Sequence, residues 1–200
     1  VISMSKCIEG MGSSIEEHDS GWLVSGSPGL NPDSLFLDCG NSGTTANFLT
    51  AISACNIGTV SLDGDRTLRS RSSKELCATL RQMGFTIDSD GVPRVVSGRI
   101  ENYDVLHDWS RTSQGLSSLM IASPGFEEEL RISLSGESVS SGYWMLTQEI
   151  CISCGSKMTV EGDEAVLPPW EIDIPEGIEI PPEESLRPVA ILLSHLHGVD

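Results

Sequence analysis

Residues 41–55, NSGTTANFLTAISAC, join a polar, glycine-containing start to an apolar segment that lacks a polar face. The run before them, LFLDC, is short and apolar, so the pattern predicts a strand, a turn and then a helix. Helices without a polar face are buried ones. The related segments TSQGLSSLMIA, from Thr112, and ESLRPVAILLS, from Glu184, follow at intervals of 71 and 72 residues. Three buried helices at a regular spacing are therefore expected.

The same period appears elsewhere in the chain. SLDG at 61–64 returns as SLSG at 133–136, which is 72 residues later. Each unit has the pattern of a strand, a buried helix, a strand, an amphipathic helix and a hairpin, or βαβαββ. We expect full units at about 33–98 and 102–175, the back half of a unit at about 1–28 and the start of another at about 178–200.

The first full unit predicts helices over Thr44–Cys55 and Ser73–Met83 and a hairpin over 85–98, with Asp90 and Gly91 at the turn. A glycine follows each second helix, where a left-handed residue ends a helix well: Gly12, Gly84 and Gly155. Central parallel sheets are covered by amphipathic helices, whereas here the first helices are apolar all round. The fold class is therefore α/β, with repeated βαβαββ units, buried helices and outer sheets.

The chain is strongly acidic, with 29 Asp and Glu against 12 Lys and Arg, a formal charge of −17. Nucleic acid is excluded as a partner because phosphate backbones are bound by clustered lysines and arginines. A few arginines in a cleft can still bind a small anion. No apolar stretch is long enough to span a membrane and no signal peptide is present, which predicts a cytoplasmic protein. The helical opening VISMSKCIEGMG suggests that the sequence begins inside a larger protein.

The cysteines predict no disulfide framework, because most of the six lie in apolar or helical surroundings. CISC at 151–154 is the one CxxC pair, and zinc there stays open as an alternative. His195 and His197 are two residues apart, so on a helix they would not chelate together. We treat both as core or surface histidines.

Two helix starts are candidate anion sites. At Asn41–Thr45, free backbone N–H groups and the positive end of the helix dipole face outward. One period later, Thr112, Ser113 and Gln114 occupy the same place. The alternative is that these side chains only cap their helices. Two such clusters in corresponding positions favour a shared ligand.

Two more clusters follow the second strands. The segment GDRTLRSRS carries three arginines, which either pair with surface carboxylates or clamp a carboxylate or phosphate: Arg66, Arg69 and Arg71. The corresponding place in the next unit offers neutral hydroxyls, as an alcohol-rich substrate requires: Ser138, Ser140, Ser141 and Tyr143.

Four ordered elements together resemble the 5-enolpyruvylshikimate-3-phosphate synthase family. GNSGTTANFLTA is similar to its GNAGT segment, and GDRTLRSRS to its GD…RP stretch. TSQGLSSLMIASP is similar to its SSQ element, and SVSSGYWMLT to its SKPY element. The resemblance implies an enolpyruvyl-transferase fold, an inside-out α/β barrel, with residues 1–200 forming most of the first of two similar domains.

By this resemblance, shikimate-3-phosphate would contact five residues: Thr112, Ser113, Gln114, Ser140 and Tyr143. Phosphoenolpyruvate would contact another set: Asn41, Gly43, Thr44, Arg71 and Gln114. The implied reaction is transfer of the enolpyruvyl group to shikimate-3-phosphate in aromatic amino-acid biosynthesis. It needs no cofactor and no metal. The proton-transfer residues belong to the second domain, so no catalytic residue is expected here, the chain alone is expected to be inactive, and we expect a monomer.

The chain departs from the family pattern at three places. Asn47 stands where the family usually has arginine, Ser72 where it has proline, and Thr112-Ser113 where it has two serines. One alternative is the related UDP-N-acetylglucosamine enolpyruvyl transferase, whose reactive cysteine has no counterpart between Gly64 and Arg71. Another is a non-catalytic binding module of the same fold, which Asn47 keeps open.

Overall fold

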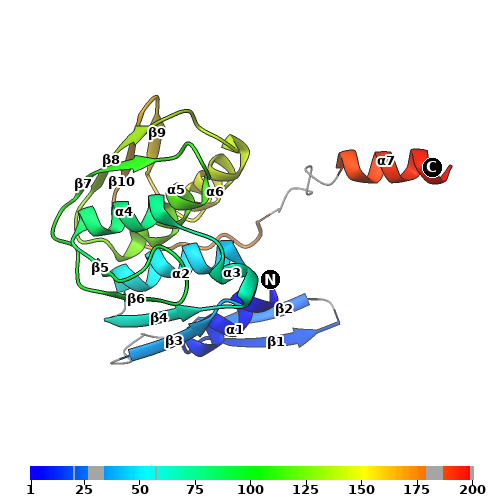
Figure 1. Cartoon of the computed structure of the whole chain (residues 1–200), viewed down its shortest axis with the longest axis horizontal. Coiled ribbons are helices and arrows are strands. Elements are labelled where there is room, and N and C mark those ends of the chain that lie inside the picture. Colours follow the sequence, from blue (N-terminus) through cyan, green and yellow to red (C-terminus); the bar gives the residue numbers. More distant parts are fainter. Residues whose placement is uncertain (20, 27–33, 57, 179–186, 199–200) are drawn as a thin grey trace.

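The computed structural model describes residues 1–19, 21–26, 34–56, 58–178 and 187–198. Two four-stranded mixed sheets organise them (Figure 1). The first has the order β3-β4-β6-β5, from β3 (Ser34–Asp38), β4 (Thr59–Asp63), β6 (Arg94–Ser97) and β5 (Thr86–Ile87). The second has the order β7-β8-β10-β9, from β7 (Asp104–Asp108), β8 (Leu130–Ser135), β10 (Glu164–Leu167) and β9 (Thr159–Glu161). In each sheet the first pair is parallel and the other pairs are antiparallel, so the two sheets share one topology.

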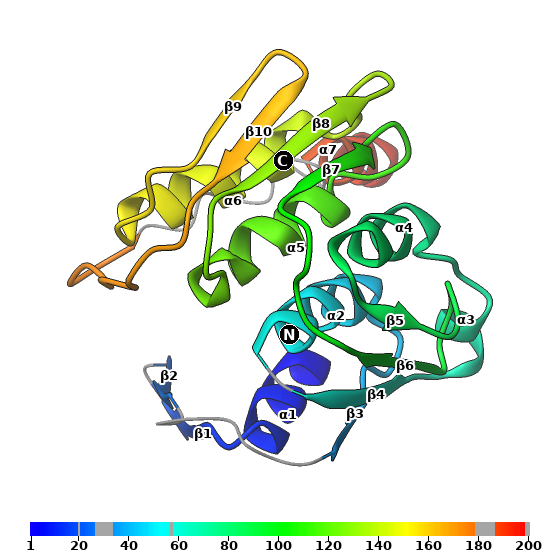
Figure 2. The same ribbon diagram turned by 90° about the vertical axis from the view of Figure 1, so that its left-hand side faces the viewer.

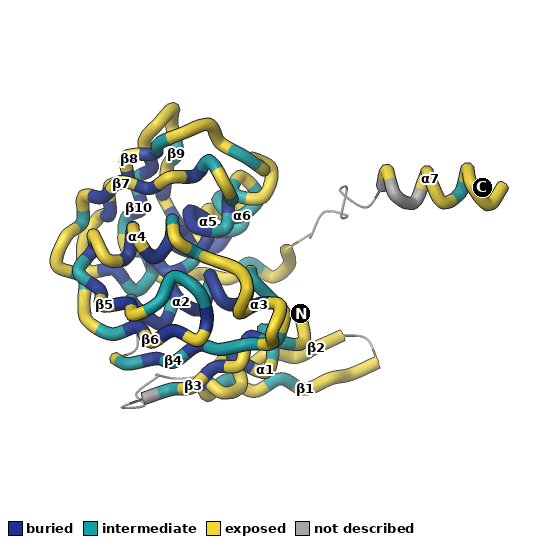
Figure 3. Tube along the Cα trace, in the orientation of Figure 1, coloured by how far each residue is buried: buried dark blue, intermediate teal, exposed yellow. Residues whose placement is uncertain are grey.

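The helices lie between the sheets (Figure 2). They are α2 (Gly43–Asn56), α4 (Lys74–Met83), α5 (Gln114–Ala122) and α6 (Ser141–Ser153). α2 packs against α5, and α5 packs against α6. Figure 3 shows that α2 and α5 are largely buried. The predicted α/β class, with buried helices and outer sheets, is therefore confirmed for these two helices.

The buried helices α2 and α5 carry several hydroxyl groups that lie inside the apolar core. The Thr50 hydroxyl donates to the carbonyl of Ala46 at 2.6 Å, and the Ser118 hydroxyl donates to the carbonyl of Gln114 at 2.7 Å. Each hydroxyl thus uses a carbonyl one turn earlier in its own helix, which satisfies the group inside the core. On the sheets, alternate residues such as Leu130 and Ile132 of β8 point into the core.

Local predictions hold at the helix ends and the hairpin. Gly12, Gly84 and Gly155 all have positive φ, as expected after the second helices. β5 and β6 form the predicted antiparallel hairpin, with Thr86 opposite Ser97. Asp90 lies in the connection, which is six residues long. Its carbonyl accepts from the backbone N–H of Ser73, at 2.8 Å, and so ties the connection to the start of α4.

The structure also contains elements outside the two four-stranded sheets and the helices between them. α1 (Ile2–Gly10) packs on β3, and β1 (Ser14–His18) pairs with β2 (Gly21–Ser25). A one-turn helix, α3 (Arg66–Arg69), and a 3-10 turn, η1 (Ser123–Gly125), were not predicted. No helix within the described residues has the length and apolarity needed to cross a membrane.

One prediction about burial is wrong. α7 (Arg187–His197) forms close to the expected place, but its large apolar side chains are exposed: Ile191, Leu192, Leu193 and Leu196. Figure 1 shows this helix away from both sheets. An apolar sequence makes burial favourable, yet in the described part of the chain no sheet lies over α7 to provide it.

Candidate functional site

The first turns of the two buried helices lie together. α2 follows β3 and α5 follows β7, and each of these strands is parallel to the next strand of its sheet. A hydrogen bond joins the side chains of the two turns, because Gln114 Nε2 donates to Thr44 Oγ1 at 3.0 Å. The backbone N–H groups of two helix starts and the positive ends of two helix dipoles are therefore gathered at one place.

A cavity of about 320 Å³ opens beside this contact. Its charged lining residues are Arg71, Arg94, Arg111 and Glu75, which together carry a formal charge of +2. The protein as a whole carries −17, so the cavity reverses the sign of the overall charge. The other lining residues are small, polar or apolar: Gly43, Thr44, Asn47, Leu68, Ser72, Ser73, Val92, Thr112 and Gln114.

Arg71 is separated from the other two arginines of its segment. Its Nη2 donates to Asn41 Oδ1 at 3.1 Å, which holds the guanidinium beside the start of α2. Arg69 instead donates to both carboxylate oxygens of Asp63, at 2.9 and 2.6 Å, and these bonds lower the pKa of that carboxyl. Arg66 lies exposed on α3. Of the three, only Arg71 lines the cavity.

Capping and cavity lining are divided among the predicted hydroxyls. The Ser42 hydroxyl accepts from the backbone N–H of Thr45 at 3.1 Å, so it caps α2. In α5 the Thr112 hydroxyl accepts from the backbone N–H of Gln114 at 3.2 Å, and Thr112 also lines the cavity. Ser113 is buried and is not among the lining residues. The capping alternative thus holds for Ser42 and accounts for part of what Thr112 does.

Asn47 completes the link between the helices. Its Nδ2 donates to Gln114 Oε1 at 2.8 Å, while its Oδ1 is buried without a hydrogen-bond partner in the part of the chain that the structure describes. Gln114 therefore bridges Thr44 and Asn47, which are one turn apart on α2. The neutral amide at position 47 thus adds a second side-chain hydrogen bond between the two helices.

The fourth predicted cluster lies at the start of α6 and does not line the cavity. Ser140 has a left-handed φ of 54°, and Tyr143 is 51 % exposed. One turn further along α6, the Thr147 hydroxyl donates to Ser117 Oγ of α5 at 3.0 Å. Since α5 and α6 each follow one of two parallel strands, their first turns lie at the same edge. The Ser138 hydroxyl instead accepts a hydrogen bond from Trp144 Nε1 at 3.1 Å.

Several residues at the cavity were not predicted as site residues, above all Arg94 and Arg111. A signal for Arg94 was present, since it alternates with Val92 and Val96 and so shares the inward face of the hairpin. Arg111 precedes Thr112 directly. Its Nη1 lies 3.7 Å from Glu75 Oε1, in an ion pair whose arginine is largely exposed.

His107 of β7 packs against α5 and does not line the cavity. Its Nδ1 is 2.8 Å from the Thr79 hydroxyl, and its Nε2 has no hydrogen-bond partner among the residues with described positions. Burial lowers the pKa of the imidazole to about 4. The ring packs directly against Gly115, where an added Cβ would sit 2.5 Å from Cε1. A neutral imidazole therefore sets the position of the first turn of α5.

The six cysteines are free, and burial keeps several of them protonated. It raises the pKa of Cys55 to about 12 and that of Cys151 to about 11. Such thiols are inert rather than nucleophilic. No cluster of three or more His, Cys, Asp or Glu residues with the geometry of a metal site occurs among the residues that the structure describes.

Comparisons with known proteins agree with this architecture. Among solved structures, EPSP synthase from Acinetobacter baumannii superposes with a TM-score of 0.73 at 21 % identity, over 90 % of this chain and 41 % of that one. This likeness concerns the fold.

Sequence relatives give a closer match. A 3-phosphoshikimate 1-carboxyvinyltransferase from Methanococcoides burtonii is 34 % identical over 168 residues, 81 % of this chain and 39 % of the relative. Its namesake from Methanothrix thermoacetophila is 38 % identical over 144 residues, 70 % of this chain and 34 % of the relative. The chain thus spans about two fifths of the length of the relatives that it matches. Residues 1–185 match the family model of EPSP synthase (3-phosphoshikimate 1-carboxyvinyltransferase), and the chain belongs to that family.

Proposed function

We propose that the intact protein transfers the enolpyruvyl group of phosphoenolpyruvate to shikimate-3-phosphate, and that this chain, residues 1–200, forms most of its first domain. The observation that carries the proposal is the cavity at the bonded starts of α2 and α5. There, Gln114 joins Thr44 and Asn47, and Arg71 lies alongside. Two anionic substrates need such a concentration of positive charge, and an acidic protein provides it only locally.

In this reaction the role of the chain is to bind the substrates and to stabilise negative charge. In the transfer, the substrate hydroxyl loses its proton and its oxygen bonds to C2 of phosphoenolpyruvate while C3 gains a proton. The tetrahedral intermediate then loses a proton from C3 and inorganic phosphate from C2, which restores the C=C bond. The negative charge of the phosphate must be held while the C–O bond breaks. A guanidinium and helix N-termini fixed in advance do this without reorganising. We assign this part to Arg71 and to the backbone at Asn41, Gly43 and Thr44.

The acceptor substrate needs hydroxyl and amide contacts as well as charge. We assign shikimate-3-phosphate to Thr112, Ser113, Gln114, Ser140 and Tyr143, as the family resemblance implies. The placement of Thr112 and Gln114 at the cavity supports this assignment directly. Ser140 and Tyr143 belong to the start of the neighbouring parallel helix, which supports a substrate that extends from α5 toward α6.

Proton transfer is assigned to a second domain, and the proposal includes neither metal nor organic cofactor. The cytoplasmic location and the monomeric state stay predictions. The UDP-N-acetylglucosamine enolpyruvyl transferase is not favoured, because the family match is to EPSP synthase and no cysteine lies between Gly64 and Arg71. The non-catalytic alternative rests on Asn47, whose neutral side chain removes one charge from the site.

Two assays of the intact protein test the proposal. Inorganic phosphate should be released only when both phosphoenolpyruvate and shikimate-3-phosphate are present. The full-length gene should also restore growth of a strain that requires aromatic amino acids because it lacks this transferase. Binding of both substrates without phosphate release would support the non-catalytic alternative instead, and binding of neither would refute the proposal.

A further inference from the structure

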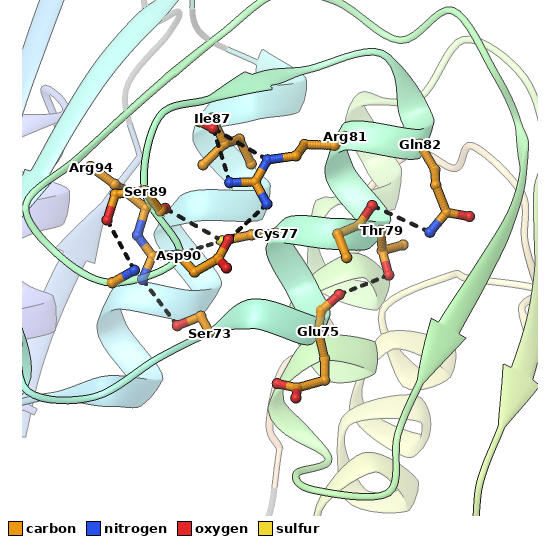
Figure 4. Close-up of polar contacts among 12 residues, drawn as sticks. Ser73, Glu75, Cys77, Thr79, Arg81, Gln82, Ile87, Ser89, Asp90 and Arg94 are labelled. Atoms are coloured by element: carbon orange, nitrogen blue, oxygen red, sulfur yellow. Dashed lines mark hydrogen bonds and ion pairs between the residues drawn. The ribbon is translucent and has the colours of Figure 1, made fainter.

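Arg94 carries a buried positive charge with neutral partners. It lies on the inward face of β6 and is 2 % exposed. Figure 4 shows its guanidinium beside the start of α4, where Nη2 donates to Ser73 Oγ at 3.0 Å and Nη1 donates to Cys77 Sγ at 3.1 Å. Its Nε is buried and has no hydrogen-bond partner among the described residues. Two neutral acceptors therefore serve a group that offers five N–H donors.

No carboxylate among the described residues lies within ion-pair distance of this guanidinium. The nearby arginine of α4 behaves differently, since Arg81 Nη1 pairs with Asp90 Oδ1 at 2.7 Å (Figure 4). An arginine stays charged at any physiological pH, and burying a charge without a counter-ion is costly. The protein contains 29 acidic side chains and places none of the described ones against Arg94. This arrangement leaves the counter-charge to come from a ligand.

The cavity supplies the place for such a ligand. Arg94 lines it together with Arg71 and Asn47, which come from different elements. Asn47 occupies the position where the family usually has arginine, and its Oδ1 is also buried without a partner. The cavity thus lacks the usual positive charge at Asn47, while Arg94 brings to it a charge that no carboxylate among the described residues neutralises.

We propose that Arg94 is an anion-binding residue of this cavity, and that it supplies from β6 the positive charge absent at Asn47. The inference rests on the proposed function and names phosphoenolpyruvate as the ligand whose oxyanion it faces. Arg71 and Arg94 then hold the anion from two elements. The site requires the hairpin of the same unit as well as the helix starts.

The test uses the intact protein and the substitution Arg94→Met, which keeps an unbranched side chain about as long as the aliphatic part of arginine and removes the charged guanidinium. Titration calorimetry with phosphoenolpyruvate, in the presence of shikimate-3-phosphate, and separately with inorganic phosphate gives the affinities. We expect both dissociation constants to rise by about ten-fold to a hundred-fold, as for a lost hydrogen bond to a charged group. A melting curve without ligand is recorded beside it, so that a loss of affinity in a variant that remains folded can be ascribed to the missing charge.

Arg99→Met is the control for net charge, since the Arg99 side chain is 85 % exposed and does not line the cavity. It should leave both affinities within about two-fold of the parent. The double variant Asn47→Arg, Arg94→Met moves the charge to the usual position and should regain affinity over Arg94→Met alone. If Arg94→Met does not fold, Arg94→Gln, which is neutral and keeps a polar side chain at this place, carries the same expectation.

Failure of the inference and failure of the proposed function give different results. If the parent binds phosphoenolpyruvate and the neutral variants at position 94 bind it equally well, the inference is wrong and the function stands. If the parent binds inorganic phosphate but not phosphoenolpyruvate, and Arg94→Met weakens the phosphate, Arg94 is an anion ligand and the proposed substrate is wrong. A parent that binds neither anion overturns both.

Discussion

Replacing Gln114 by alanine removes the side chain that joins the two helix starts. Its Nε2 has two N–H donors, of which one goes to Thr44 Oγ1 at 3.0 Å. Its Oε1 accepts from Asn47 Nδ2 at 2.8 Å. The second N–H remains available to a ligand in the cavity that Gln114 lines. The substitution therefore affects binding and stability through separate groups.

The expected magnitudes follow from these groups. The free N–H bound to an oxyanion is a charge-assisted hydrogen bond, whose loss costs about 1.5–3 kcal/mol and weakens binding about ten-fold to a hundred-fold. The two bonds to Thr44 and Asn47 are neutral, and each contributes about 0.5–1.5 kcal/mol to stability. The substitution would also remove the partner of Asn47 Nδ2, so that both polar atoms of this buried amide would lack a described partner, which adds to the loss of stability.

Titration calorimetry of the intact protein with shikimate-3-phosphate measures the binding loss, and a melting curve without ligand measures the stability loss. Gln82→Ala is a matched control, because Gln82 holds Leu106 by two bonds of 2.9 Å and does not line the cavity. The control should lower the melting temperature comparably and leave the affinity unchanged. Equal affinities for the parent and Gln114→Ala would refute the assignment of Gln114 to the ligand.

Three other substitutions probe the cavity and its support. Arg71→Ala should raise the KM for phosphoenolpyruvate about ten-fold or more, whereas Arg69→Ala, which breaks only a surface pair, should change it less than about two-fold; equal effects would place the clamp elsewhere. Burial lowers the pKa of His107 from 6.5 to about 4, so the unfolded chain takes up the proton first and the free energy of unfolding falls, by about 2 kcal/mol, as the pH drops from above 6.5 to about 5. Melting temperatures of His107→Gln should depend less on pH over that range, and an identical dependence would contradict the lowered pKa. Gly115→Ala puts a Cβ 2.5 Å from the His107 ring and should cost about 1–3 kcal/mol of stability; an unchanged melting temperature would show that the ring can move away freely.

Repetition and apolar periodicity made much of the fold predictable. The starts of α2 and α5 were placed within a residue because glycines and hydroxyls precede apolar runs there. The exposure of α7 was not predictable, since the pattern of a helix does not say which sheet lies over it.

The candidate site was predictable where its residues lie at helix starts. Thr44, Thr112 and Gln114 follow from position in the repeat, and Arg71 follows from the family motif. Arg94 was not predicted, because its role in binding depends on which groups surround its side chain in the fold. A charged residue on an inward strand position indicates a site only once the absence of a described carboxylate partner is known.

The most direct test of the central claim is a crystal structure of the intact protein with shikimate-3-phosphate and inorganic phosphate. We predict phosphate oxygens within hydrogen-bond distance of the Arg71 guanidinium, and shikimate-3-phosphate in contact with Gln114 at the joined starts of α2 and α5. Ligands bound elsewhere, with only water beside these residues, would contradict the account.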